Sequence, residues 1–337
     1  MIREAIQNLV VGKSLTMGEA SQVMDEIMEG QVTPAQFGAF VVALRLKGET
    51  VDEITGLAKV MRAKAIRVTV AEPVIDIVGT GGDGLNSFNI STVTAFVVAG
   101  AGLKVAKHGN RAASSQCGAA DVLEALSVKF NLNAEQVQKC IEEVGIGFMF
   151  APTFHPAMKY AGPPRREIGI RTVFNILGPL TNPAGAKHYL LGVADGSLVE
   201  KLTLALKSLG CNHALVVHGE DGLDEITISG PSQVCELKDG QIEKYTVSPE
   251  DFGLSIASLE SLKGGTAEHN AALLRSILWG DKGPQRDVVL MNAAAALVAG
   301  NKAKTLKQGM ELAQKSLDSG QALAKLEHLI KLSNSFT

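Results

Sequence analysis

The sequence lacks the features that would indicate a nucleic-acid-binding, disulfide-bonded or membrane protein. Its 32 basic residues are outnumbered by 35 acidic ones, giving a net charge of −3, so there is no basic footprint for general nucleic-acid binding. The four cysteines are widely spaced and form no C-x-x-C pair, which argues against disulfides and a cysteine metal site. No apolar run approaches the ~20 residues that a membrane span needs, and the N-terminus has no small-residue cleavage site. We therefore expect a cytoplasmic protein with no nucleic-acid or membrane partner.

What the chain does have is an ordinary globular composition and a purely helical beginning. Apolar residues make up 46% and charged residues 20% of 337 positions, which is enough for a large core and two domains. Thr16, Thr33 and Thr50 each precede an apolar stripe of helical period and have Glu or Gln three residues later, the pattern of a capped helix start. We expect residues 1–70 to form a small all-helical domain, to which the Pro- and Gly-rich segment near 155–187 returns.

From Val74 onward, short apolar runs alternate with helical segments, which predicts a mostly parallel central sheet with helices on both faces. The expected strands are 74–78, 103–106, 146–150, 189–193 and 214–218, and the expected helices are 91–101, 118–126, 134–144 and 196–209. The stretch 226–246 contains the turn KDGQ and predicts an antiparallel hairpin. The fold class is therefore α/β, with a large α/β domain over 71–154 and 188–337 beside the small helical domain.

The first candidate site is the glycine-rich stretch GTGGD at 79–83, which follows the first expected strand directly. Glycines there let the backbone turn tightly and present bare N–H groups to an anion. Asn89, Ser91 and Thr92 then begin an apolar helix, where we expect the Ser and Thr hydroxyls to cap an N-terminus suited to phosphate. The stretch is neither G-x-G-x-x-G nor a P-loop, which disfavours nicotinamide and ATP. A plain glycine turn before an ordinary helix is the competing interpretation.

The second candidate is KHGNRAASS at 107–115, which follows the next strand and so lies at the same carboxyl end of the sheet. Lys107 and Arg111 can neutralise phosphate, and Arg is suited to bidentate contact. Ser114 and Ser115 add hydroxyl donors just before a helix. A solvated basic loop is the competing interpretation.

The third candidate is HGEDGLDEI at 218–226, where acidic side chains follow another apolar strand. Hard carboxylate oxygens beside a phosphate pocket suggest Mg²⁺, which binds through one or two carboxylates together with substrate phosphates. A solvated acidic loop is the alternative for this stretch taken alone. Together the three loops suit one ligand that carries several phosphates and needs Mg²⁺.

These motifs, in this order and with Arg165 in PPRRE, resemble the anthranilate phosphoribosyltransferase family of tryptophan biosynthesis. The resemblance runs nearly end to end, through NILGPLTNP at 175–183 and GGTAEHNA at 264–271. It implies a nucleoside-phosphorylase-like fold with a cleft between the two domains. The implied reaction transfers the phosphoribosyl group of 5-phosphoribosyl-1-pyrophosphate to the amine of anthranilate and releases pyrophosphate. A homodimer formed through the helical domain is also implied.

The resemblance further implies which residues meet each substrate. Those expected to contact the sugar donor are Gly79, Gly82, Asp83, Ser87, Asn89, Ile90, Ser91, Thr92, Lys107, His108, Gly109, Asn110, Arg111, Ala112, Ala113, Ser114, Ser115 and Ala119. Those expected to contact anthranilate are Gly79, His108, Asn110, His155 and Arg165, and those expected to hold two Mg²⁺ ions per subunit are Ser91, Asp224 and Glu225. No dedicated acid or base is expected, because Lys107, Asn110 and Arg165 act through positioning and electrostatics.

Two positions depart from the commoner family pattern, and two other functions compete with this one. Ser87 stands where Thr is frequent, and Ala119 stands where Ser is frequent, which removes one phosphate contact worth ~1 kcal/mol.

A pyrimidine nucleoside phosphorylase shares the architecture but needs no acidic Mg²⁺ loop. A non-enzymatic nucleic-acid-binding relative would show a basic surface and lack Asn110 and Arg165.

Overall fold

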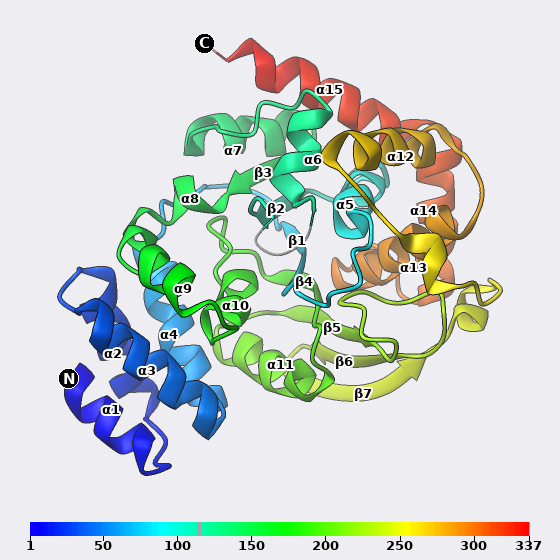
Figure 1. The fold of residues 1–337 in the computed structure, drawn as a ribbon. Helices are drawn as coiled ribbons and strands as arrows, with labels where there is room; N and C mark the ends of the chain where they lie inside the picture. The colour runs from blue at the N-terminus through cyan, green and yellow to red at the C-terminus, as the bar shows by residue number, and fades with distance from the viewer. Residues whose placement is uncertain (113–115, 337) are drawn as a thin grey trace.

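The computed structural model describes residues 1–112 and 116–336, and a helical bundle lies beside a larger α/β domain (Figure 1). The bundle helices are α1 (Ile2–Val10), α2 (Met17–Met28), α3 (Pro34–Lys47) and α4 (Val51–Lys64). The capped starts predicted at Thr16, Thr33 and Thr50 are confirmed, because each hydroxyl accepts the backbone N–H three residues on. Each threonine N–H in turn donates to the Glu or Gln side chain there, which satisfies a second backbone donor.

The α/β domain is built on a seven-stranded sheet in the order β3-β2-β1-β4-β5-β6-β7. Its strands are β1 (Ile75–Gly79), β2 (Val105–Gly109), β3 (Ile146–Phe150), β4 (His188–Gly192), β5 (His213–Gly219), β6 (Ser232–Lys238) and β7 (Gln241–Val247). The first five strands in this order pair in parallel, and β6 and β7 add an antiparallel hairpin. The predicted mostly parallel sheet and its hairpin are therefore confirmed.

Helices cover both faces of this sheet (Figure 1). On one face α5 (Ile90–Gly100) packs on β1 and β2 while α13 (Pro284–Ala299) packs on β4 and β5, and on the other α11 (Val199–Ser208) packs on β5 and β6. The residues of α5 are almost all buried, which explains its uniformly apolar sequence. The remaining α-helices are α6 (Ala119–Ala125), α7 (Ala134–Glu143), α8 (Ala151–Phe154), α9 (Gly162–Ile168), α10 (Phe174–Leu177), α12 (Ala267–Trp279), α14 (Leu306–Asp318) and α15 (Gln321–Ser335). The 3₁₀ helices are η1 (Pro156–Lys159), η2 (Gly178–Leu180), η3 (Gly196–Leu198), η4 (Pro249–Phe252) and η5 (Leu259–Leu262).

Contacts join the bundle to the α/β domain around the segment 155–187. The rings of Phe37 in α3 and Phe174 in α10 lie 5.3 Å apart between centroids. Arg62 of α4 donates to the backbone carbonyl of Leu180 and to the Tyr189 hydroxyl. The segment therefore lies between the helices of the bundle and the sheet. Across residues 1–112 and 116–336, no helix combines the length and the apolar character that a membrane span requires.

Candidate functional site

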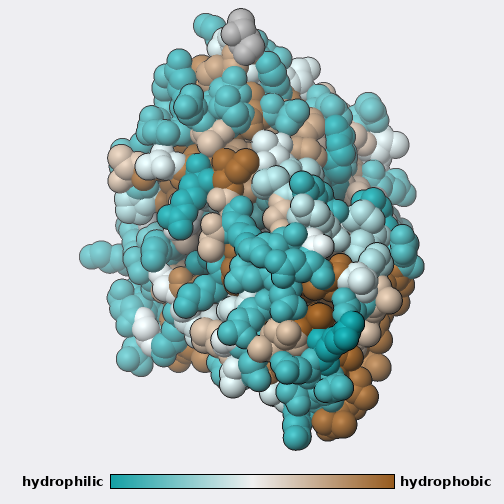
Figure 2. All heavy atoms as spheres, turned by 90° about the vertical axis from the view of Figure 1, so that its left-hand side faces the viewer, coloured by the Kyte–Doolittle hydropathy of each residue, from teal (hydrophilic) through white to brown (hydrophobic). Residues whose placement is uncertain are grey.

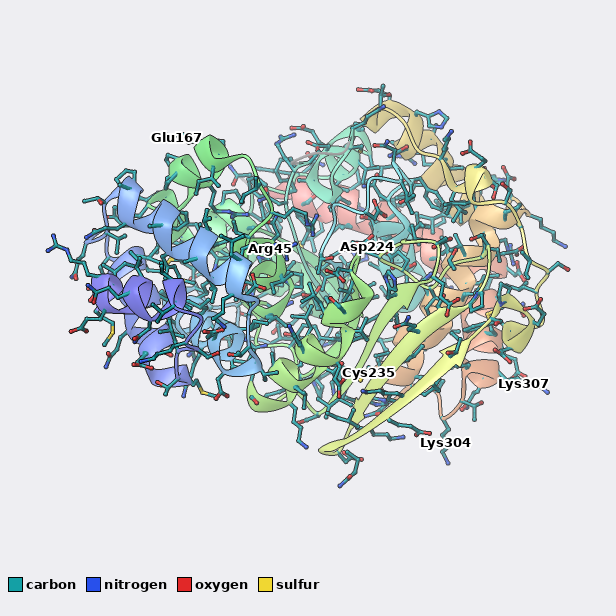
Figure 3. All side chains as sticks on the ribbon, turned by 60° about the horizontal axis from the view of Figure 1, so that its bottom comes forward. Arg45, Glu167, Asp224, Cys235, Lys304 and Lys307 are labelled. Atoms are coloured by element: carbon teal, nitrogen blue, oxygen red, sulfur yellow. The ribbon has the colours of Figure 1, made fainter. Side chains whose placement is uncertain are left out.

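The glycine-rich loop and the acidic loop meet at one edge of the sheet. Strands β1, β4 and β5 are parallel neighbours, so the loops that follow β1 and β5 emerge at the same edge. The backbone N–H of Gly81 donates to Oδ2 of Asp224 at 2.7 Å. A Cβ on Gly79 would lie 2.4 Å from that same oxygen, which is why this position requires glycine. Figure 3 shows Asp224 near the end of the central strands, in the part of the α/β domain turned toward the helical bundle.

The acidic loop brings carboxylates together in a buried place. Burial, and then repulsion from Asp83, raises the pKa of Asp224 to about 6. Burial, and then repulsion from Asp224, raises the pKa of Glu225 well above its usual value. Carboxylates that repel each other away from water are stabilised by a bound cation, so the donor set fits a hard divalent ion. In residues 1–112 and 116–336, no three His, Cys, Asp or Glu side chains form a ready-made metal site, so other oxygens must complete the coordination.

Lys107 is buried within electrostatic range of these acids and contacts the start of α5. Its Nζ donates to the Ile77 carbonyl and, at 3.2 Å, to Oγ of Ser91. Burial lowers the pKa of Lys107, while the charges of Asp76, Glu225 and Asp224 act in the opposite direction. A buried ammonium beside a hydroxyl and two acids thus places both signs of charge where the three loops converge.

The start of α5 differs from the sequence prediction. The expectation that Ser91 and Thr92 cap the helix is wrong, because Asn89 occupies the N-cap position and makes no side-chain cap. The Asn89 amide instead donates to the Cys117 carbonyl at 3.1 Å and accepts from Nδ2 of Asn270 at 3.0 Å. The Thr92 hydroxyl is buried without a partner among the described residues. Tertiary contacts therefore replace the local cap, and the sequence offered no signal for Asn270 beyond the GGTAEHNA resemblance.

Successive side chains of β2 point to opposite faces of the sheet, which separates Lys107 from His108. The ring of His108 lies against His155, with 5.0 Å between the centroids. Burial lowers the pKa of His108 to about 3 and that of His155 to about 4, so both rings are neutral. Neither Nε2 has a partner among the described residues. The two rings form a buried, uncharged surface with unused hydrogen-bonding capacity.

Asp76 is a residue of this site that sequence reasoning missed. Its carboxylate accepts from Nδ2 of Asn182 at 2.7 Å and from the backbone N–H of His108 at 3.2 Å. Asn182 also donates to the Ala106 carbonyl at 2.8 Å. Burial raises the pKa of Asp76 to about 6. These bonds join β1, β2 and the 178–183 segment, and the available signal was an acid inside the apolar run VIDIV.

Arg111 points away from the glycine-rich and acidic loops. Its guanidinium pairs with Asp121 at 2.7 Å and Glu124 at 2.8 Å, and it lies 5.0 Å from the centroid of the Phe130 ring. The backbone N–H of Ala112 also donates to Asp121. For Arg111 to contact the sugar donor, as expected from the sequence, its guanidinium must exchange these carboxylates for phosphate.

The other expected residues lie around the same edge of the sheet. Ser87 forms an isolated antiparallel β-bridge with Lys263, and it lines a small pocket together with Cys117 and Asn270. The remaining positions are Gly82 and Asp83 in the first loop, the buried Ile90 at the start of α5, Gly109 at the end of β2, the exposed Asn110 and Ala119 at the start of α6. Ala113, Ser114 and Ser115 lie outside the described residues.

Two arginines of the 155–187 segment lie on either side of a short turn. Arg165 in α9 places its guanidinium 5.3 Å from the centroid of the Phe174 ring, and burial lowers its pKa from the usual high value. Arg171, which the sequence prediction did not include, lies against Gly82 of the glycine-rich loop. The segment thus contributes one cation on the bundle side and one at the glycine-rich loop.

Comparison with known proteins accounts for nearly the whole chain. Residues 3–65 match the helical bundle domain of the glycosyl transferase family, and residues 71–323 match its a/b domain. An anthranilate phosphoribosyltransferase of Dehalococcoides mccartyi is 64% identical over 99% of both chains. The crystal structure of the Thermus thermophilus anthranilate phosphoribosyltransferase superimposes with a TM-score of 0.93 at 46% identity, covering 98% of this chain and 99% of that one. The Saccharomyces cerevisiae enzyme in complex with PRPP and Mg has a TM-score of 0.91 at 29% identity, with 99% and 98% covered.

Proposed function

The chain belongs to the anthranilate phosphoribosyltransferases of the glycosyl transferase family, and from this premise we propose the roles of its site residues. The enzyme transfers the phosphoribosyl group of 5-phosphoribosyl-1-pyrophosphate to the amine of anthranilate in tryptophan biosynthesis, releasing pyrophosphate. The observation that carries the proposed roles is the hydrogen bond from the Gly81 N–H to Asp224, which joins the glycine-rich loop to the acidic loop. Full-length similarity favours this activity over the nucleoside phosphorylase and nucleic-acid-binding alternatives.

The phosphates of the sugar donor bind to the glycine-rich loop, the N-terminus of α5 and Lys107. Backbone N–H groups at 79–83 and at a helix N-terminus are donors for oxyanions. The buried ammonium of Lys107 next to Ser91 adds positive charge. Negative charge accumulates on pyrophosphate as its bond to the sugar C1 breaks, and donors already in place stabilise it there.

Asp224, Glu225 and Ser91 would hold Mg²⁺, as two ions per subunit. Mg²⁺ uses few protein ligands and keeps substrate phosphate oxygens and water, which agrees with the half-buried Asp224, the buried Glu225 and one hydroxyl. When bound, the ions supply positive charge to the phosphate oxygens of the leaving group. Their positive charge would offset the repulsion of Asp83 on Asp224 and of Asp224 on Glu225, which adds to burial in raising the pKa of each carboxyl.

The acceptor anthranilate binds beside the histidine pair. An aromatic amine is neutral at pH 7, so no strong base is needed, and the neutral rings of His108 and His155 suit a lining role. Asn110 and Arg165 hold the acceptor, with the Arg165 guanidinium on its carboxylate. The amine then attacks C1 from the side opposite pyrophosphate, the C1–O bond to pyrophosphate breaks, and the released pyrophosphate takes up the amine proton after the new C–N bond has formed.

The helical domain closes over the α/β domain during the reaction, which excludes water that would hydrolyse the sugar donor. We assign residues 1–70 and the return segment 155–187 to this domain, and 71–154 and 188–337 to the α/β domain. The contact of Phe37 with Phe174 supports the return of that segment to the bundle.

We also propose a homodimer formed through the helical domain. Val10 and Val11 at the end of α1 are 70% and 69% exposed, and Leu46 in α3 is 83% exposed. Figure 2 looks onto the side of the molecule that carries the bundle and shows a hydrophobic patch at its lower edge. A second copy would remove such side chains from water. Four unpaired, buried cysteines agree with a reducing, cytoplasmic location.

Loss of anthranilate fluorescence tests the function directly. The purified protein should consume anthranilate only when both the sugar donor and Mg²⁺ are present, with one pyrophosphate released per anthranilate lost. Consumption without the sugar donor, or no consumption with all components, would contradict the assignment. Phosphorolysis of a pyrimidine nucleoside in the same preparation would favour the phosphorylase alternative.

A further inference from the structure

Arg171 lies on the glycine-rich loop at a contact that the function described above does not use. A Cβ added to Gly82 would collide with the Arg171 guanidinium, and Gly82 has a φ of +75°. The guanidinium therefore lies directly over the backbone of the glycine-rich loop, one residue beyond the Gly81 N–H that donates to Asp224. Two kinds of anion donor, a guanidinium and a glycine-rich backbone, converge on one point.

The Arg171 side chain is available to bind a ligand, whereas the other cations near these loops already have partners in the protein. Lys107 donates to Ser91 and to a backbone carbonyl, and Arg111 is held by Asp121 and Glu124. Arg171 is exposed and makes no ion pair or side-chain hydrogen bond with the described part of the chain. Its charge acts on Asp224 across the loop. It thus lies between the glycine-rich backbone and the acids without being bound to either.

The backbone on the C-terminal side of Arg171 is fixed by burial and a hydrogen bond. Thr172 is buried, and its N–H donates to Oδ1 of Asn175 at 2.9 Å. Val173 and Phe174 follow and are also buried. The fixed backbone directs an exposed, flexible side chain to the glycine-rich loop, an arrangement suited to reaching a ligand bound there.

We propose that Arg171 is a substrate-binding residue that contacts the pyrophosphate group of the sugar donor over the glycine-rich loop. This inference rests on the proposed function, because it names a further ligand of the same substrate. The guanidinium donates two N–H groups to phosphate oxygens, which a lysine at this position cannot do in the same planar geometry. Arg171 is distinct from Arg165, whose guanidinium lies over Phe174 on the bundle side.

Three variants test this proposal. For each variant we measure KM for both substrates, the binding of inorganic pyrophosphate by calorimetry with and without Mg²⁺, and the thermal unfolding temperature. Arg171→Ala should raise KM for the sugar donor about tenfold or more and weaken pyrophosphate binding by a similar factor. KM for anthranilate should stay within about twofold. Arg171→Lys should give an intermediate loss. Arg166→Ala removes an exposed arginine of the same segment and should change neither constant.

Two results would overturn the proposal. If Arg171→Ala leaves pyrophosphate affinity unchanged and tightens Mg²⁺ binding, Arg171 only neutralises the acids. If both KM values rise together with a lower unfolding temperature, its role is structural. Pyrophosphate binding needs no turnover, so an inactive wild-type protein would contradict the proposed function while this test of Arg171 could still be read.

Discussion

Asn292 of α13 binds both backbone groups of Ile226, the residue that follows Glu225. Its Oδ1 accepts the Ile226 N–H at 3.0 Å, and its Nδ2 donates to the Ile226 carbonyl at 2.9 Å. The same Nδ2 donates to the Val288 carbonyl at 2.9 Å, and the side chain is fully buried within the otherwise apolar stretch 288–299 of this helix. The amide thus pairs with the loop as a neighbouring strand would, and it holds the acidic residues from behind.

Asn292→Ala should weaken Mg²⁺ binding because two buried backbone groups lose their partner and the acidic loop is no longer held. We expect a loss of about 2–4 kcal/mol in unfolding free energy and a higher Mg²⁺ concentration for half-maximal rate. Denaturant unfolding and a Mg²⁺ titration measure the two effects. Ser316→Ala is the control, because it removes another buried bond, to the Val97 carbonyl, away from the acids. A Mg²⁺ requirement that moves equally in both variants would contradict this role.

Arg165→Ala should raise KM for anthranilate about tenfold or more, because a charge-assisted bond to the acceptor carboxylate is lost. KM for the sugar donor should change far less. Steady-state kinetics with each substrate varied in turn gives both constants, and Arg165→Lys should recover part of the loss. Equal effects on the two KM values would remove Arg165 from the acceptor site.

Asp224→Asn and Glu225→Gln should flatten the dependence of rate on Mg²⁺, because each removes a charged oxygen ligand while keeping the shape of the side chain. Direct titration with Mn²⁺ followed by paramagnetic resonance measures metal binding without turnover. Glu220→Gln is the matched control in the same loop, because Glu220 is exposed. A wild-type metal titration in the first two variants would exclude both acids.

Gly82→Ala and Gly84→Ala separate backbone strain from collision with Arg171. Both glycines have a φ of +75°, but only a Cβ on Gly82 meets the Arg171 guanidinium, whereas Gly84 has open space. Each substitution should cost about 1–2 kcal/mol of unfolding free energy through strain. Only Gly82→Ala should also raise KM for the sugar donor. If the two variants bind the sugar donor equally well, the contact with Arg171 has no role in binding.

Stability should fall at acid pH partly through Glu236, which accepts from Nε2 of His213 at 2.8 Å and from the Tyr245 hydroxyl at 2.7 Å. The bond from His213 is the largest cause of a lowered Glu236 pKa, and burial opposes it. A carboxyl whose pKa is lower in the folded than in the unfolded protein stabilises the folded state. This stabilisation is complete at pH values above the unfolded-state pKa of about 4.3, and it is lost as the pH falls through the folded-state pKa.

Glu236→Gln should therefore lose less unfolding free energy than the wild type between about pH 6 and pH 3. Denaturant unfolding at a series of pH values measures the difference. Parallel curves for the two proteins would show that Glu236 does not contribute to acid sensitivity.

Local patterns predicted the elements of this fold well because each depends on neighbours in the chain. The capping threonines 16, 33 and 50 need only a Glu or Gln three residues later. The strand–helix alternation after Val74 likewise reports burial on both faces of a parallel sheet. The cap predicted at Ser91 and Thr92 failed because Asn270, far along the chain, provides a partner for Asn89.

By itself, the sequence determined the order of the elements, the chemistry of the three loops and the family to which they belong. Periodicity, glycine and charge are properties of residues that are close in the chain, and they can be read without knowing the fold. Tertiary structure decided that the buried charge of Lys107 acts on Asp224 and Glu225, that Arg111 turns to α6 and that Arg171 reaches Gly82. These relationships depend on which distant segments meet and on burial, which is the largest cause of the raised pKa values of Asp224 and Glu225.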